Sequence, residues 1–319
     1  MTALDARDQL ILHRLASGSW VSGALLAEEL RISRAALSKR IERLRSGPWG
    51  LAIVSRHGAG YALEGGLDLL TSAPGQAQPE LVDIPGLSIV PSCSSTNAIL
   101  AERSHIQSLC AEFQDQGRGR LGRAWIAPYA SSLLLSHRHH YPRWPHHLSA
   151  LSLVLGLALC RWLNQQGIPV RLKWPNDLWL EGKKLAGMLI ESRGEALSGC
   201  EIIVGLGLNV HTQALAQVDQ PWTSLDQAGF SVKRAELLRD ALACLKHALL
   251  SFEHTPLSRL LQDYDEWDAL RGQQVQLRDG EKVYSGQNRG ISAQGALRLA
   301  NASGQETLFA VGDLSLRPQ

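Results

Sequence analysis

Residues 117–125 read GRGRLGRAW, and the first six letters match the G-x-G-x-x-G pattern of dinucleotide-binding folds. That pattern requires a helix directly after the glycines and an acidic residue about 20 positions further on. Here Trp125 and Pro128 fall in the first turns of such a helix, and a histidine-rich stretch stands where the acid is required. The stretch also lacks the Gly-Lys-Ser/Thr ending of a P-loop. The sequence therefore excludes both of these nucleotide-binding folds and leaves a loop.

A loop that carries Arg118, Arg120 and Arg123 among glycines has a different chemical use. Backbone amides and guanidinium groups can surround a phosphate or an acyl-phosphate and neutralise charge that develops during a reaction. Glycine allows such a loop to move when it is empty and to fold over a ligand. The alternative is a solvated basic hairpin tip, but arginines interleaved with glycines and followed by Trp125 favour a binding loop.

The whole chain has the composition of a globular protein. Its 319 residues suffice for about two or three domains, and 45% hydrophobic residues suffice for packed cores. The formal net charge is +2, so any contact with nucleic acid must be local. Five cysteines without a C-x-x-C spacing favour reduced thiols. The N-terminus lacks the apolar core of a secretory signal, and the apolar run 148–163 is shorter than the about 20 residues of a membrane span. We therefore expect a cytoplasmic protein with no membrane partner.

The first segment, residues 1–66, has the pattern of a winged helix. Apolar residues at helical spacing predict three short helices, and two strands joined by a tight turn follow them. These elements are expected at residues 4–16, 23–30, 34–45, 51–55 and 60–63. Ser33 is expected to cap the third helix. Two short helices with a basic second member indicate a helix-turn-helix, and the hairpin makes it a winged helix.

Basic residues lie on the third predicted helix and at the tip of the wing. The alternative to DNA binding is a three-helix interaction domain whose basic face is merely solvated. Charges on the helix and the wing together favour DNA. The candidate DNA contacts are Ser33, Arg34, Ser38, Lys39, Arg40, Arg56 and His57.

Three further segments follow the winged helix. Residues 67–82 lose periodicity and gain Pro, Gly, Gln and Ser, which predicts a linker. Residues 83–268 alternate strand-like and helical stretches, as in a mixed-sheet α/β domain. Residues 269–319 hold short strands split by Gly, Asn and Asp turns, which predicts a small β-barrel of the SH3 type. The predicted fold class is therefore a multidomain α+β protein.

Two stretches of the central segment place charges at strand ends. KWPND, residues 173–177, reads as a strand that ends in a turn exposing Asp177. KKLAG, residues 183–187, opens a strand with Lys184 and continues through a small Ala-Gly pair, which suits a charge directed into a pocket. Each has a plainer interpretation, with Asp177 as a turn former and Lys184 as an edge-strand charge. GLGLN, residues 205–209, reads as another strand end and contains two glycines.

Together these motifs resemble the biotin–protein ligases. The resemblance rests on Ser95-Thr96-Asn97, Gln114 with the loop 117–125, KWPND, KLAG and Gly205–Asn209. The N-terminal winged helix makes the chain more similar to the bifunctional bacterial type, which is both a ligase and a repressor of the biotin operon. The resemblance covers essentially the full length, with the domains in the same order.

The resemblance implies roles for individual residues. Lys184, Arg118 and Arg120 would act at the carboxylate–phosphate junction, and Asp177 would lie close to the metal and the acceptor lysine. Residues 117–123 would become ordered over biotin and its adenylate. The residues implied to bind biotin or the adenylate are Ser95, Thr96, Asn97, Gln114, Gly117, Arg118, Gly119, Arg120, Arg123, Trp125, Lys184, Gly187, Gly205 and Asn209. Leu121 departs from the family, which often has arginine there, so the loop has one cation fewer.

The reaction implied by the resemblance uses ATP, biotin and Mg²⁺. ATP would convert biotin to biotinyl-5′-AMP, and a lysine of the biotin carboxyl carrier protein of acetyl-CoA carboxylase would then receive the biotin. Mg²⁺ would be held mostly by substrate phosphates, with its protein ligands undefined. Biotinyl-AMP would also act as a corepressor that promotes a homodimer, which would set two winged helices at a fixed spacing on a palindromic operator DNA.

Two other functions and one other site remain open at this point. A lipoate ligase would share the central fold and the adenylation chemistry, although such chains do not usually carry a winged helix with this loop. A ligand-sensing repressor with an inactive enzyme domain is the second alternative, and retention of Lys184, Asp177 and the arginine loop argues against it. Residues 137–147, HRHHYPRWPHH, suggest a metal site, but we expect a solvated surface loop because nothing nearby supplies a second shell.

Overall fold

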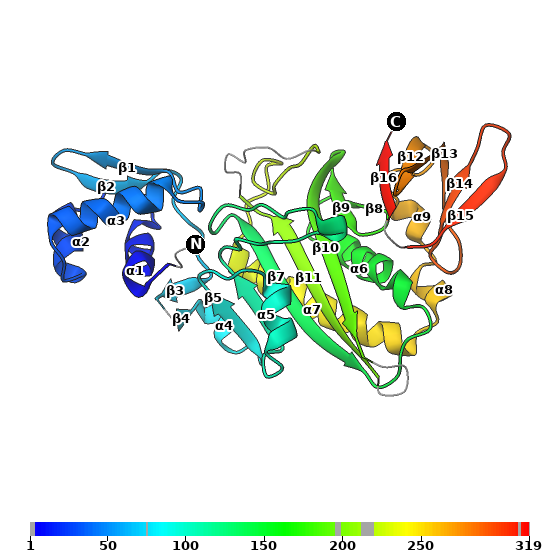
Figure 1. The fold of residues 1–319 in the computed structure, drawn as a ribbon, viewed down its shortest axis with the longest axis horizontal. Coiled ribbons are helices and arrows are strands. Elements are labelled where there is room, and N and C mark those ends of the chain that lie inside the picture. The colour runs from blue at the N-terminus through cyan, green and yellow to red at the C-terminus, as the bar shows by residue number, and fades with distance from the viewer. Residues whose placement is uncertain (1–3, 75, 195–198, 212–219, 312–313, 319) are drawn as a thin grey trace.

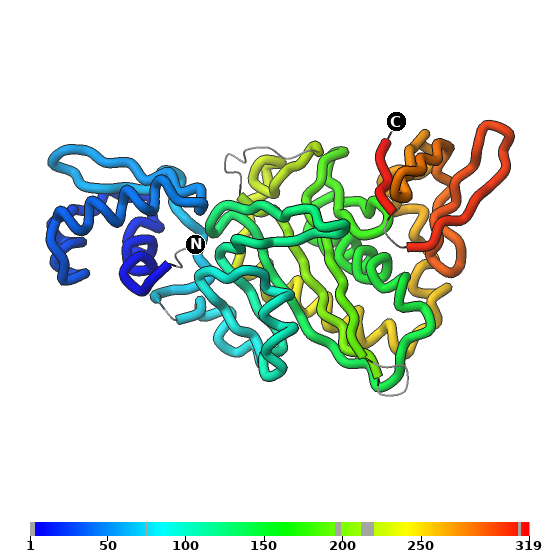
Figure 2. The backbone as a smooth tube through the Cα atoms, viewed as in Figure 1, coloured from blue at the N-terminus to red at the C-terminus, as the bar shows by residue number. Residues whose placement is uncertain are grey.

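The computed structural model describes residues 4–74, 76–194, 199–211, 220–311 and 314–318. Three units follow one another along the long axis of the molecule: a helical N-terminal unit, a central sheet with helices, and a small β unit at the C-terminal end (Figure 1). The chain enters the central unit from the N-terminal one through a single connection (Figure 2).

The N-terminal unit is a helix-turn-helix with a wing. Its elements are α1 (Ala6–Leu15), α2 (Gly23–Glu29), α3 (Arg34–Ser46), β1 (Ile53–Arg56) and β2 (Gly60–Leu63). Ser33 caps α3 as predicted, because its side chain accepts a hydrogen bond from the backbone N–H of Ala36. Ile11 and Leu15 of α1 and Ile41 of α3 are buried and form the core with their neighbours. The winged-helix prediction is confirmed.

The segment predicted as a linker carries regular structure of its own. It contains β3 (Thr71–Ala73), β4 (Gln76–Ala77) and the short helix α4 (Pro79–Val82). Leu69 and Leu70 are buried, and Leu69 belongs to the same hydrophobic cluster as the N-terminal helices. That cluster also includes Phe113 and Tyr129 of the central unit. The winged helix and the central unit therefore share packed apolar surface and are not merely tethered.

A seven-stranded mixed sheet forms the central unit, in the order β5-β6-β7-β11-β10-β9-β8. Only β5 and β6 pair in parallel, and the other neighbours are antiparallel. The strands are β5 (Leu87–Val90), β6 (Ser108–Ala111), β7 (Ser132–Tyr141), β8 (Arg171–Lys173), β9 (Asp177–Leu180), β10 (Lys183–Arg193) and β11 (Cys200–Asn209). Sequence patterning missed β9, which pairs with β8 across the Pro-Asn turn.

Helices cover the two faces of this sheet. Alternation along β11 sends Ile202 and Val204 into the main core with α6 (Leu151–Gln165) and α7 (Arg234–His254), whereas Ile203 packs against α5 (Thr96–Glu102). By length and composition, Leu148–Gln165 is apolar enough to cross a membrane. It is instead a core helix, because α6 packs against α7 and against β8, β9 and β10.

The C-terminal unit begins after the short helices α8 (Leu257–Leu260) and α9 (Tyr264–Trp267). Its five antiparallel strands have the order β15-β14-β13-β12-β16. Their bounds are β12 (Gln274–Asp279), β13 (Lys282–Ile291), β14 (Leu297–Ala300), β15 (Glu306–Phe309) and β16 (Leu314–Pro318). This agrees with the predicted SH3-like β unit, although its end strands β15 and β16 are not paired with each other among the described residues.

The histidine-rich stretch differs from the expectation of a solvated loop. Its first residues, His137–Tyr141, are the end of β7. His137 is buried beside the Ser108 hydroxyl, and burial lowers the pKa of its imidazole to about 3. The expectation of a solvated loop was wrong for residues 137–141. The alternation of apolar and polar residues that marks a strand is hidden here, because polar side chains face the interior. No cluster of metal-ligating side chains occurs in the described part of the chain, this stretch included.

Candidate active site

One cavity of about 320 Å³ lies where the central sheet, the glycine–arginine loop and the C-terminal unit meet. It receives side chains from segments far apart in the sequence. All residues predicted to bind biotin or the adenylate line this cavity except Gly117, and so does Asp177: Ser95, Thr96, Asn97, Gln114, Arg118, Gly119, Arg120, Arg123, Trp125, Asp177, Lys184, Gly187, Gly205 and Asn209. The fold therefore brings the motifs together in one place.

The loop 117–125 forms a small hairpin over the cavity, and no α-helix follows it. Gly119 N–H donates to the carbonyl of Arg123 over 2.7 Å, and Trp125 N–H donates to that of Gly117 over 2.8 Å. Residues 120–122 make a single 3₁₀ turn, in which Leu121 and Gly122 have positive φ. Gly117 supports this hairpin without lining the cavity, since a Cβ there would lie 2.6 Å from the carbonyl oxygen of Trp125.

Lys184 is directed into the cavity by an irregularity in β10. The register between β10 and β9 shifts between Lys184 and Ala186, and such a bulge redirects a side chain. The Lys184 ammonium lies 2.8 Å from Asp177 Oδ1 and 5.5 Å from the centre of the Trp125 ring. Gly187 pairs with Asp177 across the sheet, and a Cβ on Gly187 would lie 3.1 Å from Lys184 Nζ. A glycine is therefore needed beside this lysine.

Asp177 is buried, in contrast to the exposed turn position that the sequence predicted. Lys173, which sequence analysis did not single out, places its Nζ 3.6 Å from Asp177 Oδ2. Burial acts to raise the pKa of Asp177, but Lys184 and Lys173 outweigh it and hold that pKa below its usual range. Burial lowers the pKa of Lys173, with Asp177 opposing the shift. The pair of lysines thus keeps a buried carboxylate ionised.

Another part of the cavity wall, called the neutral end below, offers uncharged hydrogen-bonding groups. Thr96 is at the start of α5, and its backbone N–H donates to Gln114 Oε1 over 2.7 Å. Asn97 rests on Gly205, where a Cβ would lie 2.5 Å from Asn97 Oδ1. Asn209 donates through Nδ2 to the carbonyl of Thr223 over 3.1 Å, which fixes its amide at the end of β11.

The C-terminal unit also contributes to the cavity, which sequence analysis did not predict. Arg123 donates through its guanidinium to Ser315 Oγ over 3.1 Å, and residues 314–317 of β16 are part of the wall. Arg120 donates to Asn176 Oδ1 over 3.1 Å. The sequence predicted short strands in this unit, but no signal marked β16 as part of the cavity, because its residues reach the cavity only through the packing of two units.

The residues present suit Mg²⁺ only as a partner of substrate phosphates. Asp177 and Asn176 supply a carboxylate and an amide oxygen, which are ligand types that Mg²⁺ accepts. No group of three His, Cys, Asp or Glu side chains able to hold a metal occurs among the described residues. A metal ion here would therefore take most of its ligands from phosphate.

The candidate DNA surface divides into two sets. Arg34, Ser38 and Lys39 are exposed on α3, and Ser33 precedes them. Arg56 and His57 are exposed on the wing, where the Arg56 guanidinium lies 4.6 Å from the centre of the Trp20 ring. Arg40 differs from the rest, because it donates to Asp5 and to the buried Asp8 of α1, both at 2.8 Å. Its guanidinium holds α1 against α3 in the structure.

Family models match this chain in three successive parts. A model described as "HTH domain" matches residues 7–62, the "Biotin/lipoate A/B protein ligase family" matches 91–209, and the "Biotin protein ligase C terminal domain" matches 271–317. Among solved structures, the biotin protein ligase from Aquifex aeolicus in complex with biotin and ATP is similar. Its TM-score is 0.63 and its identity 26%, covering 74% of this chain and all of that one.

Curated relatives extend the similarity to the whole chain. The bifunctional ligase/repressor BirA of Escherichia coli (strain K12) is 35% identical over 314 residues, covering 96% of each chain. The biotin–[acetyl-CoA-carboxylase] ligase of Mycobacterium tuberculosis is 32% identical over 241 residues, covering 72% of this chain and 88% of that one. The chain therefore belongs to the family of bifunctional biotin–protein ligases that are also transcriptional repressors.

Proposed function

We propose that the cavity binds biotin with its ureido ring against Thr96, Asn97 and Gln114, and with its carboxylate toward Lys184. One observation carries this proposal: uncharged hydrogen-bonding groups and the cations Lys184, Arg118 and Arg120 line one cavity of about 320 Å³. Biotin has the same division, since a neutral ring and a carboxylate lie at its two ends. Trp125, near Lys184, offers a flat surface for the adenine of ATP.

In the first step the biotin carboxylate attacks the α-phosphorus of ATP, biotinyl-5′-AMP forms and pyrophosphate leaves. Both reacting groups are negative, so their repulsion raises the barrier. Lys184, Arg118 and Arg120 would offset this charge, most strongly where it accumulates in the transition state. Lys184 suits the task because Asp177 holds its ammonium in one position. Bound Mg²⁺ would further neutralise the phosphates.

In the second step a lysine amine of the carrier protein attacks the acyl carbon, a C–N bond forms and the C–O bond to AMP breaks. The amine must first lose a proton. Asp177 is a weak base, because Lys184 and Lys173 outweigh its burial and lower its pKa. We therefore assign Asp177 to orienting Lys184 and to accepting a hydrogen bond from the incoming amine, in place of a full general-base role.

The hairpin 117–123 would fold over the adenylate between the two steps. Its arginines reach Asn176 on one side of the cavity and Ser315 on the other. A closed loop would exclude water from the mixed anhydride and limit its hydrolysis.

The ligase activity is tested by incubating the protein with ATP, Mg²⁺ and labelled biotin or lipoate, with and without a biotin carboxyl carrier domain. We expect a biotin-sized mass increase on one carrier lysine and formation of biotinyl-AMP without the carrier. Transfer of lipoate in preference to biotin would overturn the assignment of the neutral end to a ureido ring. Absence of any adenylate would leave the chain a repressor only.

Repression is proposed to follow from the same ligand. Binding of biotinyl-AMP would favour a homodimer and place two copies of α3 on a palindromic operator, with Arg34, Ser38 and Lys39 toward the DNA. The need for ATP and for operator DNA supports a cytoplasmic location. Sedimentation and operator gel shifts, with and without biotin plus ATP, test this proposal. A protein that binds the operator equally in both conditions would refute the corepressor role.

A further inference from the structure

We infer that Glu191, which lies outside the cavity, sets the direction of the hydrogen bonds that the cavity offers to the ureido ring. The inference deepens the proposed function and rests on its placing of that ring. Glu191 is on β10, opposite Ile203 of β11, and it is not part of the cavity wall. Its effect would pass through side chains that are.

A continuous chain of short hydrogen bonds connects Glu191 with the cavity. Asn97 donates through Nδ2 to Glu191 Oε2 over 2.6 Å. The Ser136 hydroxyl, fully buried on β7, lies 2.6 Å from Asn97 Oδ1 and 2.6 Å from Thr96 Oγ1. Thr96 N–H then reaches Gln114 Oε1. This series of hydrogen bonds thus joins four segments that are distant in the sequence.

The Glu191 carboxylate fixes the direction of the hydrogen bonds among the side chains of Asn97, Ser136 and Thr96. A carboxylate only accepts, so the Asn97 amide must turn its Nδ2 toward Glu191 and its Oδ1 toward Ser136. Asn97 Oδ1 has no proton, and the single Ser136 proton must therefore go to it. Ser136 can then only accept from Thr96, so the Thr96 proton goes to Ser136 Oγ at 2.6 Å and not to Gln114 Oε1, which lies farther from Thr96 Oγ1, at 3.1 Å. An Asn amide alone could face either way, and Glu191 removes this ambiguity.

The cavity consequently presents a defined pattern of donors and acceptors. With its proton directed at Ser136, Thr96 Oγ1 has only lone pairs for a ligand. With Oε1 occupied by the backbone of Thr96, Gln114 has Nε2 protons for a ligand. A cyclic urea carries N–H donors beside a carbonyl acceptor, so the Thr96 oxygen matches an N–H. If the Asn97 amide were reversed, Ser136 would donate to Thr96 Oγ1 and occupy one of its lone pairs, and the Thr96 proton would turn toward Gln114 Oε1 or the ring N–H. Thr96 would then be a poorer acceptor for the ring, and binding would weaken.

Glu191 is thus a positioning residue, and its removal is tested by steady-state kinetics on the full-length protein. For Glu191→Ala we expect the KM for biotin to rise about tenfold, the usual effect of losing a charge-assisted hydrogen bond. The kcat and the KM for ATP should change less than about twofold, because the cations Lys184, Arg118 and Arg120 are untouched. Glu191→Gln keeps an acceptor oxygen but can also donate, so its effect should be smaller, about threefold.

A double-mutant cycle with Thr96→Val distinguishes positioning from general damage to the sheet. If Glu191 acts through Thr96, the double variant should be little worse than Thr96→Val alone. Glu201→Ala is the matched control. Glu201 is on the neighbouring strand β11, is paired with Arg138 at 2.6 Å and is not part of the wall of this cavity, so its loss should leave the KM for biotin unchanged.

The outcomes separate this inference from the placing of biotin on which it rests. If Gln114→Ala and Thr96→Val raise the KM for biotin but Glu191→Ala does not, the inference about Glu191 is wrong, and the proposed position of the ureido ring is supported. Additive effects in the cycle, or an equal rise in the KM for ATP, would also overturn it. If Gln114→Ala and Thr96→Val leave the KM for biotin unchanged, the proposed placing itself fails.

Discussion

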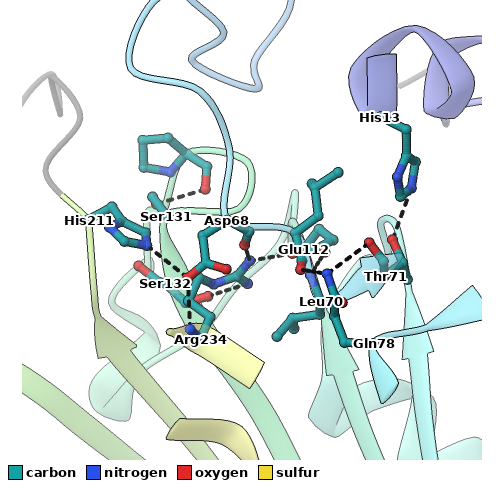
Figure 3. A network of polar contacts seen from close by, with 12 residues as sticks. His13, Asp68, Leu70, Thr71, Gln78, Glu112, Ser131, Ser132, His211 and Arg234 are labelled. Atoms are coloured by element: carbon teal, nitrogen blue, oxygen red, sulfur yellow. Dashed lines mark hydrogen bonds and ion pairs between the residues drawn. The ribbon is translucent and has the colours of Figure 1, made fainter. Parts of the chain in front are cut away.

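Two short connecting segments, the largely apolar residues 67–71 before the central unit and the glycine- and arginine-rich residues 117–123 over the cavity, are held in opposite ways. The first is anchored by buried charge. Leu70 N–H donates to Glu112 Oε1 over 2.7 Å, and Glu112 pairs with Arg234 at 2.7 Å, both side chains being buried (Figure 3). The second is mostly exposed, and its backbone bonds close a hairpin on itself.

Asp68 extends the anchor in both directions. Its carboxylate accepts from the backbone N–H of Arg234 at 2.7 Å and lies 3.2 Å from His211 Nε2. Thr71 Oγ1 lies 3.0 Å from His13 Nε2 of α1, so the same segment also contacts the winged helix. The difference teaches that a short connecting segment is fixed when its polar groups bond to buried ions, whereas a loop that must admit a ligand keeps its charges at the surface.

Loss of one buried ion is expected to have the largest effect. Glu112→Gln leaves the Arg234 guanidinium buried without its countercharge, so the free energy of unfolding should fall by about 3–5 kcal/mol. Denaturant unfolding followed by tryptophan fluorescence measures this. The control is Glu29→Gln, which breaks the exposed pair of Arg14 and Glu29 and should cost at most about 1 kcal/mol. If the two variants lost the same free energy of unfolding, buried charge would not be what anchors residues 67–71.

The loop should show the reverse behaviour. Arg118 is exposed and lines the cavity, so Arg118→Ala should slow adenylate formation about 100-fold, as expected for a lost electrostatic contact in the transition state. Its free energy of unfolding should stay within about 0.5 kcal/mol of the parent protein. Single-turnover formation of biotinyl-AMP gives the rate. Arg143→Ala, which removes an exposed arginine outside the cavity, should alter neither quantity.

Anchoring by Asp68 should depend on acidity. Burial acts to raise the pKa of Asp68, but His211 and Arg234 outweigh it and lower that pKa. A lowered folded-state pKa gives stabilisation that is complete above the unfolded value of about 3.9 and is lost as the pH falls through the folded value. Asp68→Asn should therefore cost about 1–2 kcal/mol at neutral pH and much less in strong acid. Unfolding at pH 7 and in strong acid tests this, with Asp83→Asn, which changes an exposed carboxylate, as the control.

Sequence patterns predicted the features that short stretches of the chain encode, and they missed those that depend on contacts between distant segments. The winged helix and the strands β10 and β11 were predictable, because periodicity marks them locally. The convergence of Lys184 with the arginine loop was predicted only through the resemblance to the biotin–protein ligases. The burial of Asp177, the role of Lys173 and the wall from β16 were not, because they arise from contacts between distant segments. Arg40 on the predicted DNA-binding helix shows the same limit, since its partners Asp5 and Asp8 lie on another helix.

The smallest expected effect concerns Leu121, at the exposed tip of the loop. Its side chain is 45% exposed and its φ is 58°, so arginine would keep the same backbone strain and add a cation near a bound phosphate. Leu121→Arg should therefore slow release of biotinyl-AMP by no more than about threefold, or about 0.6 kcal/mol, because exposed charges are screened. The dissociation rate of labelled adenylate measures this at low and high salt, and the gain should shrink at high salt. Leu121→Gln separates charge from shape, since it should leave release unchanged. A large gain that persisted in high salt would mean that the tip becomes buried on closure, and the loop would then resemble the anchored segment at 67–71.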